Sequence, residues 1–98
     1  AVLSSGMGSI GERTAAYAWL YRASKAALNS VLKDASIVLA GKAVCVAMDP
    51  GWVRTDMGGP GAPIEVSQSV SDMRRTLARL TAADNGSFLK RDGQARAW

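Results

Sequence analysis

Residues 43–48 are the stretch that most constrains the fold of this chain. The run reads Ala-Val-Cys-Val-Ala-Met, is rich in apolar and β-branched side chains, and shows no alternation of apolar and polar positions. Such a run is typical of a strand in a parallel sheet that is covered on both faces. Asp49-Pro50-Gly51 follows and ends the run sharply. The sequence therefore predicts an α/β protein.

The longest helical pattern, from about residue 18 to residue 40, precedes this strand and supports the same class. Gly41 stands where a glycine commonly ends a helix. Residues 1–4 form a short apolar run before the helix, so that strand, long helix and strand follow one another as in a right-handed βαβ unit. Apolar residues recur in the helix at steps of three and four and form one stripe: Leu28, Val31, Leu32, Ala35 and Leu39.

The second half of the chain adds a loop, a helix and a strand. Residues 51–63 contain four glycines and two of the three prolines, and loops of this length are commonly lids or binding segments. A turn at Asp84-Asn85-Gly86 leads to a short strand at residues 87–89. Between them, residues 64–80 show an amphipathic helix with one apolar face, in which Met73 is expected to fill the core: Val66, Val70, Met73, Leu77 and Leu80.

Composition excludes several classes of protein. The 98 residues suit one small domain, and the net charge of +4 comes from scattered cations, which disfavours a nucleic-acid-binding surface. The chain has no histidine, which removes Ser-His-Asp and Cys-His catalysis and most zinc sites, and we expect no metal. Its single cysteine, Cys45, is expected to pack as a small apolar side chain.

The ends and the hydropathy of the chain bear on its location and completeness. No stretch approaches the roughly 18 apolar residues of a membrane span, and no signal peptide is visible, so a soluble, cytoplasmic protein is expected. The chain begins inside an apolar run without Met. This start is typical of a sequence cut within a strand, and we expect a fragment.

Tyr21 and Lys25 are the residues with the clearest chemical potential. They are four apart, so on a helix their side chains share one face, about 5–6 Å apart at Cβ. The ammonium favours the ionised phenol, which suits proton transfer. A tyrosine and a lysine at this spacing also occur by chance, and the pair alone would be weak evidence for catalysis.

Two further features are expected at the same edge of the sheet. Ser4 and Ser5 follow the first predicted strand, and Pro50-Gly51 follows the second. Tyr21 and Lys25 lie near the start of the helix between them. Because ligands of open α/β sheets bind just outside the carboxyl ends of the strands, this edge is the predicted site.

On these residues the sequence resembles the short-chain dehydrogenase/reductase family, over nearly the whole chain and over the C-terminal part of that family's domain. The resemblance is greatest to its C-factor and sniffer-like carbonyl reductase branch. It implies the C-terminal half of a Rossmann-like, doubly wound parallel sheet, with residues 1–98 as its catalytic portion. The matching stretches are Leu3-Ser-Ser5 with Gly8-Ser9, Tyr21-Arg-Ala-Ser-Lys-Ala-Ala-Leu-Asn29, Pro50-Gly-Trp-Val-Arg-Thr-Asp-Met-Gly58, Asn85-Gly-Ser-Phe88, Gly93 and Trp98.

The resemblance also implies roles by position. Tyr21 would be the general acid/base, Lys25 would assist it and bind the nicotinamide ribose, and Ser5 would hydrogen-bond the substrate carbonyl. The loop after Thr55, through Pro63, would be a mobile lid over the substrate. The nicotinamide of NADP, or of NAD, would lie against residues matching the family's cofactor segment: Pro50, Gly51, Val53 and Thr55.

Three departures from the family pattern stand beside these roles. Sixteen positions separate Ser5 from Tyr21, a few more than is usual in the family, so Ser9, twelve before Tyr21, is the alternative serine. Tyr17 lacks a lysine four residues later, and Asn29 is expected to be structural. The Gly-rich pyrophosphate loop and the family's active-site asparagine are absent from these residues.

The sequence therefore predicts an oxidoreductase that transfers hydride between NAD(P)H and a small carbonyl or alcohol substrate. Residues 1–98 by themselves are expected to be inactive, and the full-length protein to be a homodimer or homotetramer, the latter by resemblance alone. The alternatives are a non-catalytic, Rossmann-like binding or regulatory relative and a non-functional truncated fragment. An intact set of serine, tyrosine and lysine argues against the non-catalytic relative.

Overall fold

Three parallel strands form a single sheet, in which β2 is central and the strand order β1-β2-β3 follows the chain. The computed structural model describes all 98 residues. Ala47 of β2 lies opposite Val2 on one side and Phe88 on the other. The elements are β1 (Val2–Leu3), η1 (Gly6–Gly8), α1 (Trp19–Val38), β2 (Val46–Asp49), α2 (Val66–Arg79), η2 (Ala82–Asp84) and β3 (Ser87–Lys90). The predicted class and the predicted order of strand, long helix, strand, loop, helix and strand are both confirmed.

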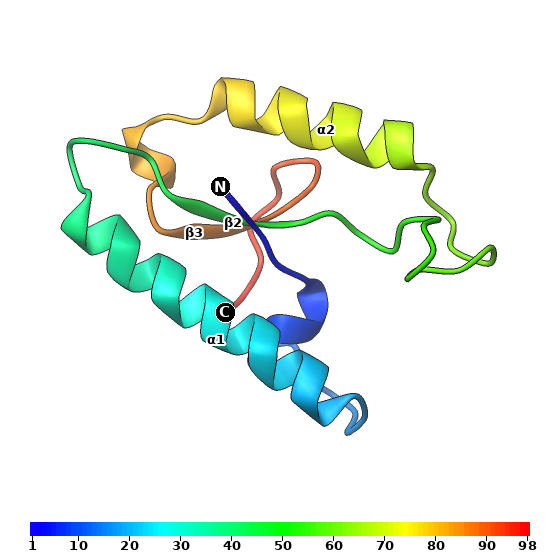
Figure 1. Cartoon of the computed structure of the whole chain (residues 1–98). Helices are drawn as coiled ribbons and strands as arrows, with labels where there is room; N and C mark the ends of the chain where they lie inside the picture. Colours follow the sequence, from blue (N-terminus) through cyan, green and yellow to red (C-terminus); the bar gives the residue numbers. More distant parts are fainter.

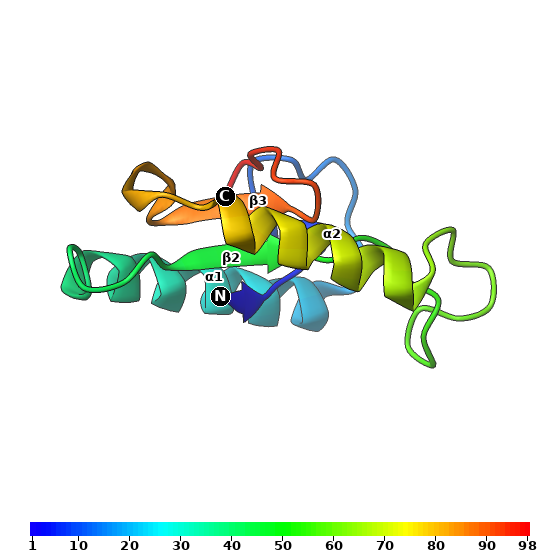
Figure 2. The same ribbon diagram turned by 90° about the horizontal axis from the view of Figure 1, so that it is seen from above.

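The two long helices cover opposite faces of the sheet (Figures 1 and 2). Cys45 and Ala47 belong to the apolar cluster that includes Leu32 of α1. Val46 and Met48 belong to a second cluster, against which Met73 of α2 packs. Successive side chains of a strand point to opposite faces, so β2 supplies both clusters and is fully buried from Val46 to Met48. The prediction of a strand covered on both faces is confirmed, as is the apolar packing of Cys45.

The arrangement of the helices requires two crossovers of opposite hand. The three strands follow one another in one direction across the sheet, and two right-handed crossovers would then place both helices on the same face. Helices α1 and α2 lie on opposite faces, as Figure 1 shows. One of the two connections is therefore left-handed, which is rare between parallel strands.

The apolar stripes predicted for the helices are buried only in part. Val66, Val70 and Leu77 of α2 are each more than a third exposed, whereas Met73 reaches the core as expected. The buried face of α2 is rotated by part of a turn from the predicted apolar stripe and contains Ser69, Asp72 and Thr76. Of the stripe predicted for the first helix, Val31 in α1 and Leu39, directly after α1, are exposed. Leu32 alone of that stripe is fully buried, beside Asn29 and Ser36.

Hydrogen bonds explain why polar side chains replace apolar ones beneath α2. The Ser69 hydroxyl donates to the Pro50 carbonyl oxygen at 2.7 Å, and the Thr76 hydroxyl donates to the Arg91 carbonyl oxygen at 2.8 Å. Asp72 forms an ion pair with Arg91. These bonds join α2 to the segments that follow β2 and β3, and buried polar groups are tolerated because they have such partners.

The C-terminal residues fold back across the sheet edge. Ala95 pairs with Leu89 in an antiparallel bridge, and the Trp98 ring stacks on Phe88 with 5.5 Å between ring centroids. The Trp98 carbonyl oxygen accepts hydrogen bonds from the Gly11 N–H and the Ser9 hydroxyl. The tail therefore fixes the loop that follows β1. None of the helices has the length and apolar character needed to cross a membrane.

Candidate functional site

The site lies at the carboxyl edge of the sheet. Ser4 and Ser5 come directly after β1, and Pro50-Gly51 comes directly after β2. Because the two strands are parallel, both pairs emerge at one edge. The 3-10 helix η1 and the first turns of α1 lie side by side at this edge (Figure 1). The structure thus brings together the segments that the sequence placed at the predicted site.

The three serines after β1 have different hydrogen bonds. The Ser5 hydroxyl accepts the Met7 N–H at 3.1 Å, and its own proton has no acceptor within the chain. The Ser4 hydroxyl is buried and donates to Asn29 Oδ1 at 2.6 Å. The Ser9 hydroxyl is 1% exposed, donates to the Ala97 carbonyl oxygen at 2.6 Å and accepts the Glu12 N–H. Of the three, Ser5 therefore has a free proton to offer a substrate.

Tyr21 and Lys25 lie in the first two turns of α1, with Lys25 Nζ 6.0 Å from the centroid of the Tyr21 ring. Lys25 Nζ also donates to the Leu3 carbonyl oxygen at 3.0 Å, which ties the helix to the end of β1. Tyr21 is half-buried, and no acceptor lies within hydrogen-bond distance of its hydroxyl. The two side chains thus lie side by side on the face of α1 that is tied to the end of β1.

Gly8 allows η1 to approach α1 at this point. A Cβ at residue 8 would lie 2.8 Å from Lys25 Cβ and 3.0 Å from the Lys25 carbonyl carbon. Real side chains do not approach so closely, so any larger residue would displace the helix or the loop. A glycine here therefore sets the distance between the serine-bearing turn and the face of α1 that carries Lys25.

The segment after β2 is fixed by its neighbours. Gly51 has a φ of 82°, a conformation that favours glycine, and its N–H donates to Asp49 Oδ1 at 3.0 Å. Val53 pairs with Ile64 in an isolated parallel bridge, and the Thr55 hydroxyl accepts the Gly58 N–H at 3.1 Å. The loop over residues 51–64 thus has hydrogen bonds of its own and presents a defined backbone at the sheet edge.

Three charged residues at the site were not identified from the sequence. Arg96 Nη1 lies 3.2 Å from Asp49 Oδ2, and Arg96 Nε lies 3.0 Å from Glu12 Oε2. A Cβ on Gly6 would collide with the Arg96 guanidinium, so the arginine lies against the backbone after Ser5. No short-range spacing could have indicated this group, because its members are separated by 37 and 47 positions in the chain.

The residues present fit the nicotinamide end of a dinucleotide. Lys25 supplies an ammonium, Tyr21 a hydroxyl, and the close backbone at Gly51 forms a surface that a Cβ would alter by striking Ile64 at 2.6 Å. No Gly-rich turn between a strand and a helix, of the kind that binds a pyrophosphate, occurs in the 98 residues. The chain therefore fits one end of such a cofactor.

Comparisons with known proteins agree with this geometry. No established family profile matches the chain. The chain is 39% identical over 97 residues to C-signal of Myxococcus xanthus, a match that covers 98% of this chain and 58% of that protein. It is 30% identical to 1-hydroxy-2-glutathionyl-2-methyl-3-butene dehydrogenase of Rhodococcus sp., covering 99% of this chain and 45% of that enzyme. The chain thus spans about half the length of the curated relatives it matches.

Solved structures are similar over the same extent. The carbonyl reductase Sniffer of D. melanogaster superposes with a TM-score of 0.94 at 41% identity, over 98% of this chain and 39% of that one. NADPH-bound carbonyl reductase from chicken fatty liver superposes with a TM-score of 0.86 at 39% identity, covering 98% of this chain and 41% of that one. Over almost its whole length the chain is similar to carbonyl reductases and to a protein described as a short-chain dehydrogenase/reductase, and the predicted likeness to the C-signal and Sniffer branch is confirmed.

Proposed function

We propose that residues 1–98 are the C-terminal catalytic portion of an NADP(H)-dependent carbonyl reductase. The observation that carries this proposal is the Tyr21–Lys25 pair on one face of α1, tied through Lys25 to the end of the strand that bears Ser5. The similarity to two carbonyl reductases, one of them NADPH-bound, supports the reaction and the cofactor.

In this proposal Tyr21 donates a proton to the substrate oxygen during reduction and accepts it during alcohol oxidation. Lys25, which lies beside the Tyr21 ring, binds the ribose next to the nicotinamide. The free proton of Ser5 hydrogen-bonds the carbonyl oxygen, where negative charge develops. When bound, the nicotinamide supplies the hydride. Residues that would hold it are Tyr21, Lys25, Pro50, Gly51, Val53 and Thr55.

Residues 1–98 by themselves are expected to be inactive. They provide the proton donor and the carbonyl partner, but no pyrophosphate-binding turn. A dinucleotide held at one end only would bind weakly, so the isolated residues are expected to show no turnover. The loop from Thr55 to Pro63 lies next to the cofactor segment and is proposed as the lid over the substrate. A cytoplasmic location of the protein stays a prediction.

The test is the substitution Tyr21→Phe in the full-length protein, with NADPH oxidation followed in the presence of a carbonyl substrate. Loss of the acid/base hydroxyl is expected to lower kcat by about a hundredfold or more. Ser67→Ala, which removes an exposed hydroxyl from α2, is the matched control and is expected to retain the parental rate. Turnover of Tyr21→Phe within a few-fold of the parent would exclude Tyr21 as the acid/base.

We further propose that the full-length protein is a homodimer or homotetramer that associates through α1. Leu20, Val31 and Val38 lie along one side of this helix and are 88%, 65% and 75% exposed. Exposed apolar patches of this kind commonly mark interfaces. Val31→Glu combined with Val38→Glu is expected to reduce the mass measured by light scattering to that of a monomer, and an unchanged mass would place the interface elsewhere.

A further inference from the structure

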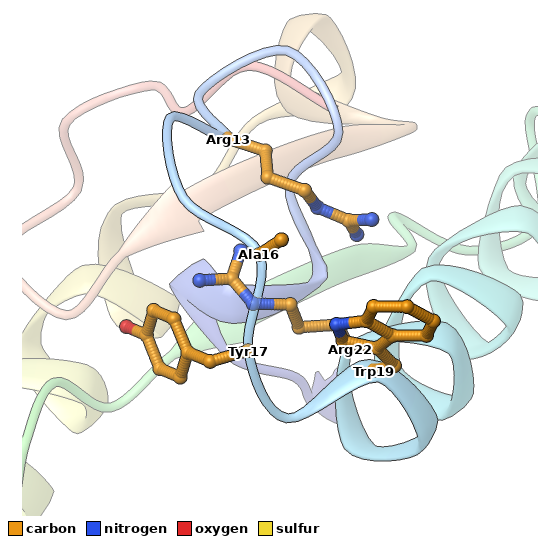
Figure 3. A pocket seen from close by; sticks show the side chains of 5 residues that line it. All are labelled: Arg13, Ala16, Tyr17, Trp19 and Arg22. Atoms are coloured by element: carbon orange, nitrogen blue, oxygen red, sulfur yellow. The ribbon is translucent and has the colours of Figure 1, made fainter.

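A small cavity of about 250 Å³ lies at the N-terminal end of α1. Arg13 and Ala16 of the loop before the helix form one part of its wall, and Tyr17, Trp19 and Arg22 form the rest (Figure 3). Neither Ser5, Tyr21 nor Lys25 lines it. The cavity is therefore a separate feature, and nothing in the proposed reaction requires it.

Arg22 is the unusual residue of this cavity. Its side chain is buried, with 7% of the residue exposed, and its guanidinium lies 4.3 Å from the centroid of the Tyr17 ring. Its Nε is buried without a hydrogen-bond partner, and no carboxylate pairs with it. A buried charge without an anion is costly. The aromatic face of Tyr17 compensates for only part of that cost.

The surroundings of Arg22 are also short of negative charge. Arg13, the second arginine of the cavity, forms no ion pair, and Glu12 beside it is engaged by Arg96 at 3.0 Å. No side chain caps the N-terminus of α1, and its first turn contains no acidic residue. Free N–H groups and the helix dipole make such an end attractive to anions. Two guanidinium groups and an uncapped helix end thus form an electropositive surface that suits an anion.

The shape and the walls of the cavity indicate the kind of anion. Figure 3 shows the Arg22 guanidinium between Ala16 and the Tyr17 ring, with the Trp19 indole on the other side of the cavity. The Arg22 guanidinium covers one face of the Tyr17 ring, so the exposed Trp19 indole is the aromatic face available to a planar apolar group. A guanidinium fork favours a carboxylate. A volume of 250 Å³ is below the range of about 300–1,000 Å³ of sites that hold drug-sized ligands, so the occupant is small.

We propose that this cavity is a binding site for a small aromatic carboxylate, with the carboxylate at Arg22 and Arg13 and the ring against Trp19. Benzoate is the probe, and benzamide, which has the same shape without the charge, is its comparison. In isothermal titration calorimetry of the full-length protein at fixed ionic strength, benzoate is expected to bind one site per chain with a Kd of about 1 mM or lower. Benzamide is expected to bind at least about tenfold more weakly.

Two substitutions and a control test the site directly. Arg22→Gln and Arg13→Gln are each expected to weaken benzoate binding by about tenfold, the loss expected for a hydrogen bond to a charged group. Arg74→Gln removes the same charge from an exposed position on α2 and is expected to leave binding unchanged. Arg13 lies in an exposed loop, so its variant is informative even where Arg22→Gln lowers the yield of folded protein.

Three results would overturn the proposal. They are the absence of saturable benzoate binding, equal binding of benzoate and benzamide, and unchanged binding in Arg13→Gln and Arg22→Gln. Because the readout is binding and not turnover, these results are independent of the Tyr21→Phe experiment. Reductase activity without benzoate binding would contradict only the proposed binding site. Benzoate binding without reductase activity would contradict only the proposed function.

Discussion

At the scale of single residues, hydrogen bonds distinguish Ser5, the serine that the sequence favoured, from Ser9, the alternative it left open. Ser5 and Ser9 were both candidates because each precedes Tyr21 at a plausible spacing. In the structure, the proton of Ser9 is held by the Ala97 carbonyl oxygen, whereas the proton of Ser5 is free. The geometry therefore favours Ser5 as the partner of the substrate carbonyl and gives Ser9 a role in anchoring the C-terminal tail.

This difference leads to opposite expectations for two alanine variants of the full-length protein. Ser5→Ala is expected to lower kcat by about a hundredfold, as for loss of one donor to a developing oxyanion, with little change in Tm. Ser9→Ala is expected to reduce the free energy of unfolding by about 1–2 kcal/mol with a smaller loss of kcat, because it leaves buried partners unsatisfied. Enzyme assays and urea denaturation measure both, and a folded Ser9→Ala protein without activity would reverse the assignment.

How much of the site the sequence predicts depends on the separation of its residues. Tyr21 and Lys25 are neighbours on a helix whatever the tertiary fold, so their spacing was informative. The burial of Arg22 and the contacts of Arg96 depend on segments that are distant in the chain or irregular in structure. No local pattern encodes such contacts, and only the folded chain could show them.

At the scale of secondary-structure elements, α2 shows that an apolar stripe does not fix which face of a helix is buried. Asp72 is 8% exposed and pairs with Arg91 while accepting a hydrogen bond from Gln68 at 2.8 Å. Val70, a member of the predicted stripe, is 44% exposed. The bonds that α2 makes to the segments after β2 and β3 set its rotation, and these bonds are tertiary.

The rotation of α2 can be tested by comparing a polar and an apolar position. Asp72→Ala is expected to lower the free energy of unfolding of the full-length protein by about 2 kcal/mol, because Arg91 loses its carboxylate in a largely buried setting. Val70→Ser is expected to change it by about 0.5 kcal/mol or less, as is usual for exposed positions. Denaturant unfolding measures both, and a larger loss for Val70→Ser would place the apolar stripe, rather than the polar face, against the protein interior.

At the scale of the whole molecule, the C-terminal tail connects the segments that form the site. Arg96 pairs with Asp49 at the end of β2 and with Glu12 in the loop after β1, and it lies against the backbone at Gly6. Trp98 adds the stack on Phe88 and accepts hydrogen bonds from the same loop. The positions of the serine turn and of the cofactor segment are therefore linked through the tail.

Removing the charge of Arg96 is expected to weaken this link. Arg96→Met is expected to lower the free energy of unfolding of the full-length protein by about 1–2 kcal/mol, because Asp49 loses a largely buried partner. In a double-mutant cycle with Asp49→Asn, the two changes are expected to be non-additive by about 0.5–1.5 kcal/mol. Lys42→Met, at an exposed position without an ion pair, is the control. Additive effects of Arg96→Met and Asp49→Asn would show that the pair contributes nothing of its own.

The sequence by itself determined the class of fold, the order of its elements and the Tyr21–Lys25 pair. These features depend on local periodicity, on the unbroken apolar run of the central strand and on glycine or proline at its end, all of which act within a few residues. Only the tertiary structure decided the opposite hands of the two crossovers, the buried polar face of α2, the hydrogen bonds that distinguish Ser5 from Ser9, and the unpaired Arg22. These depend on contacts between distant segments, whose free energies outweigh the local preferences of each element.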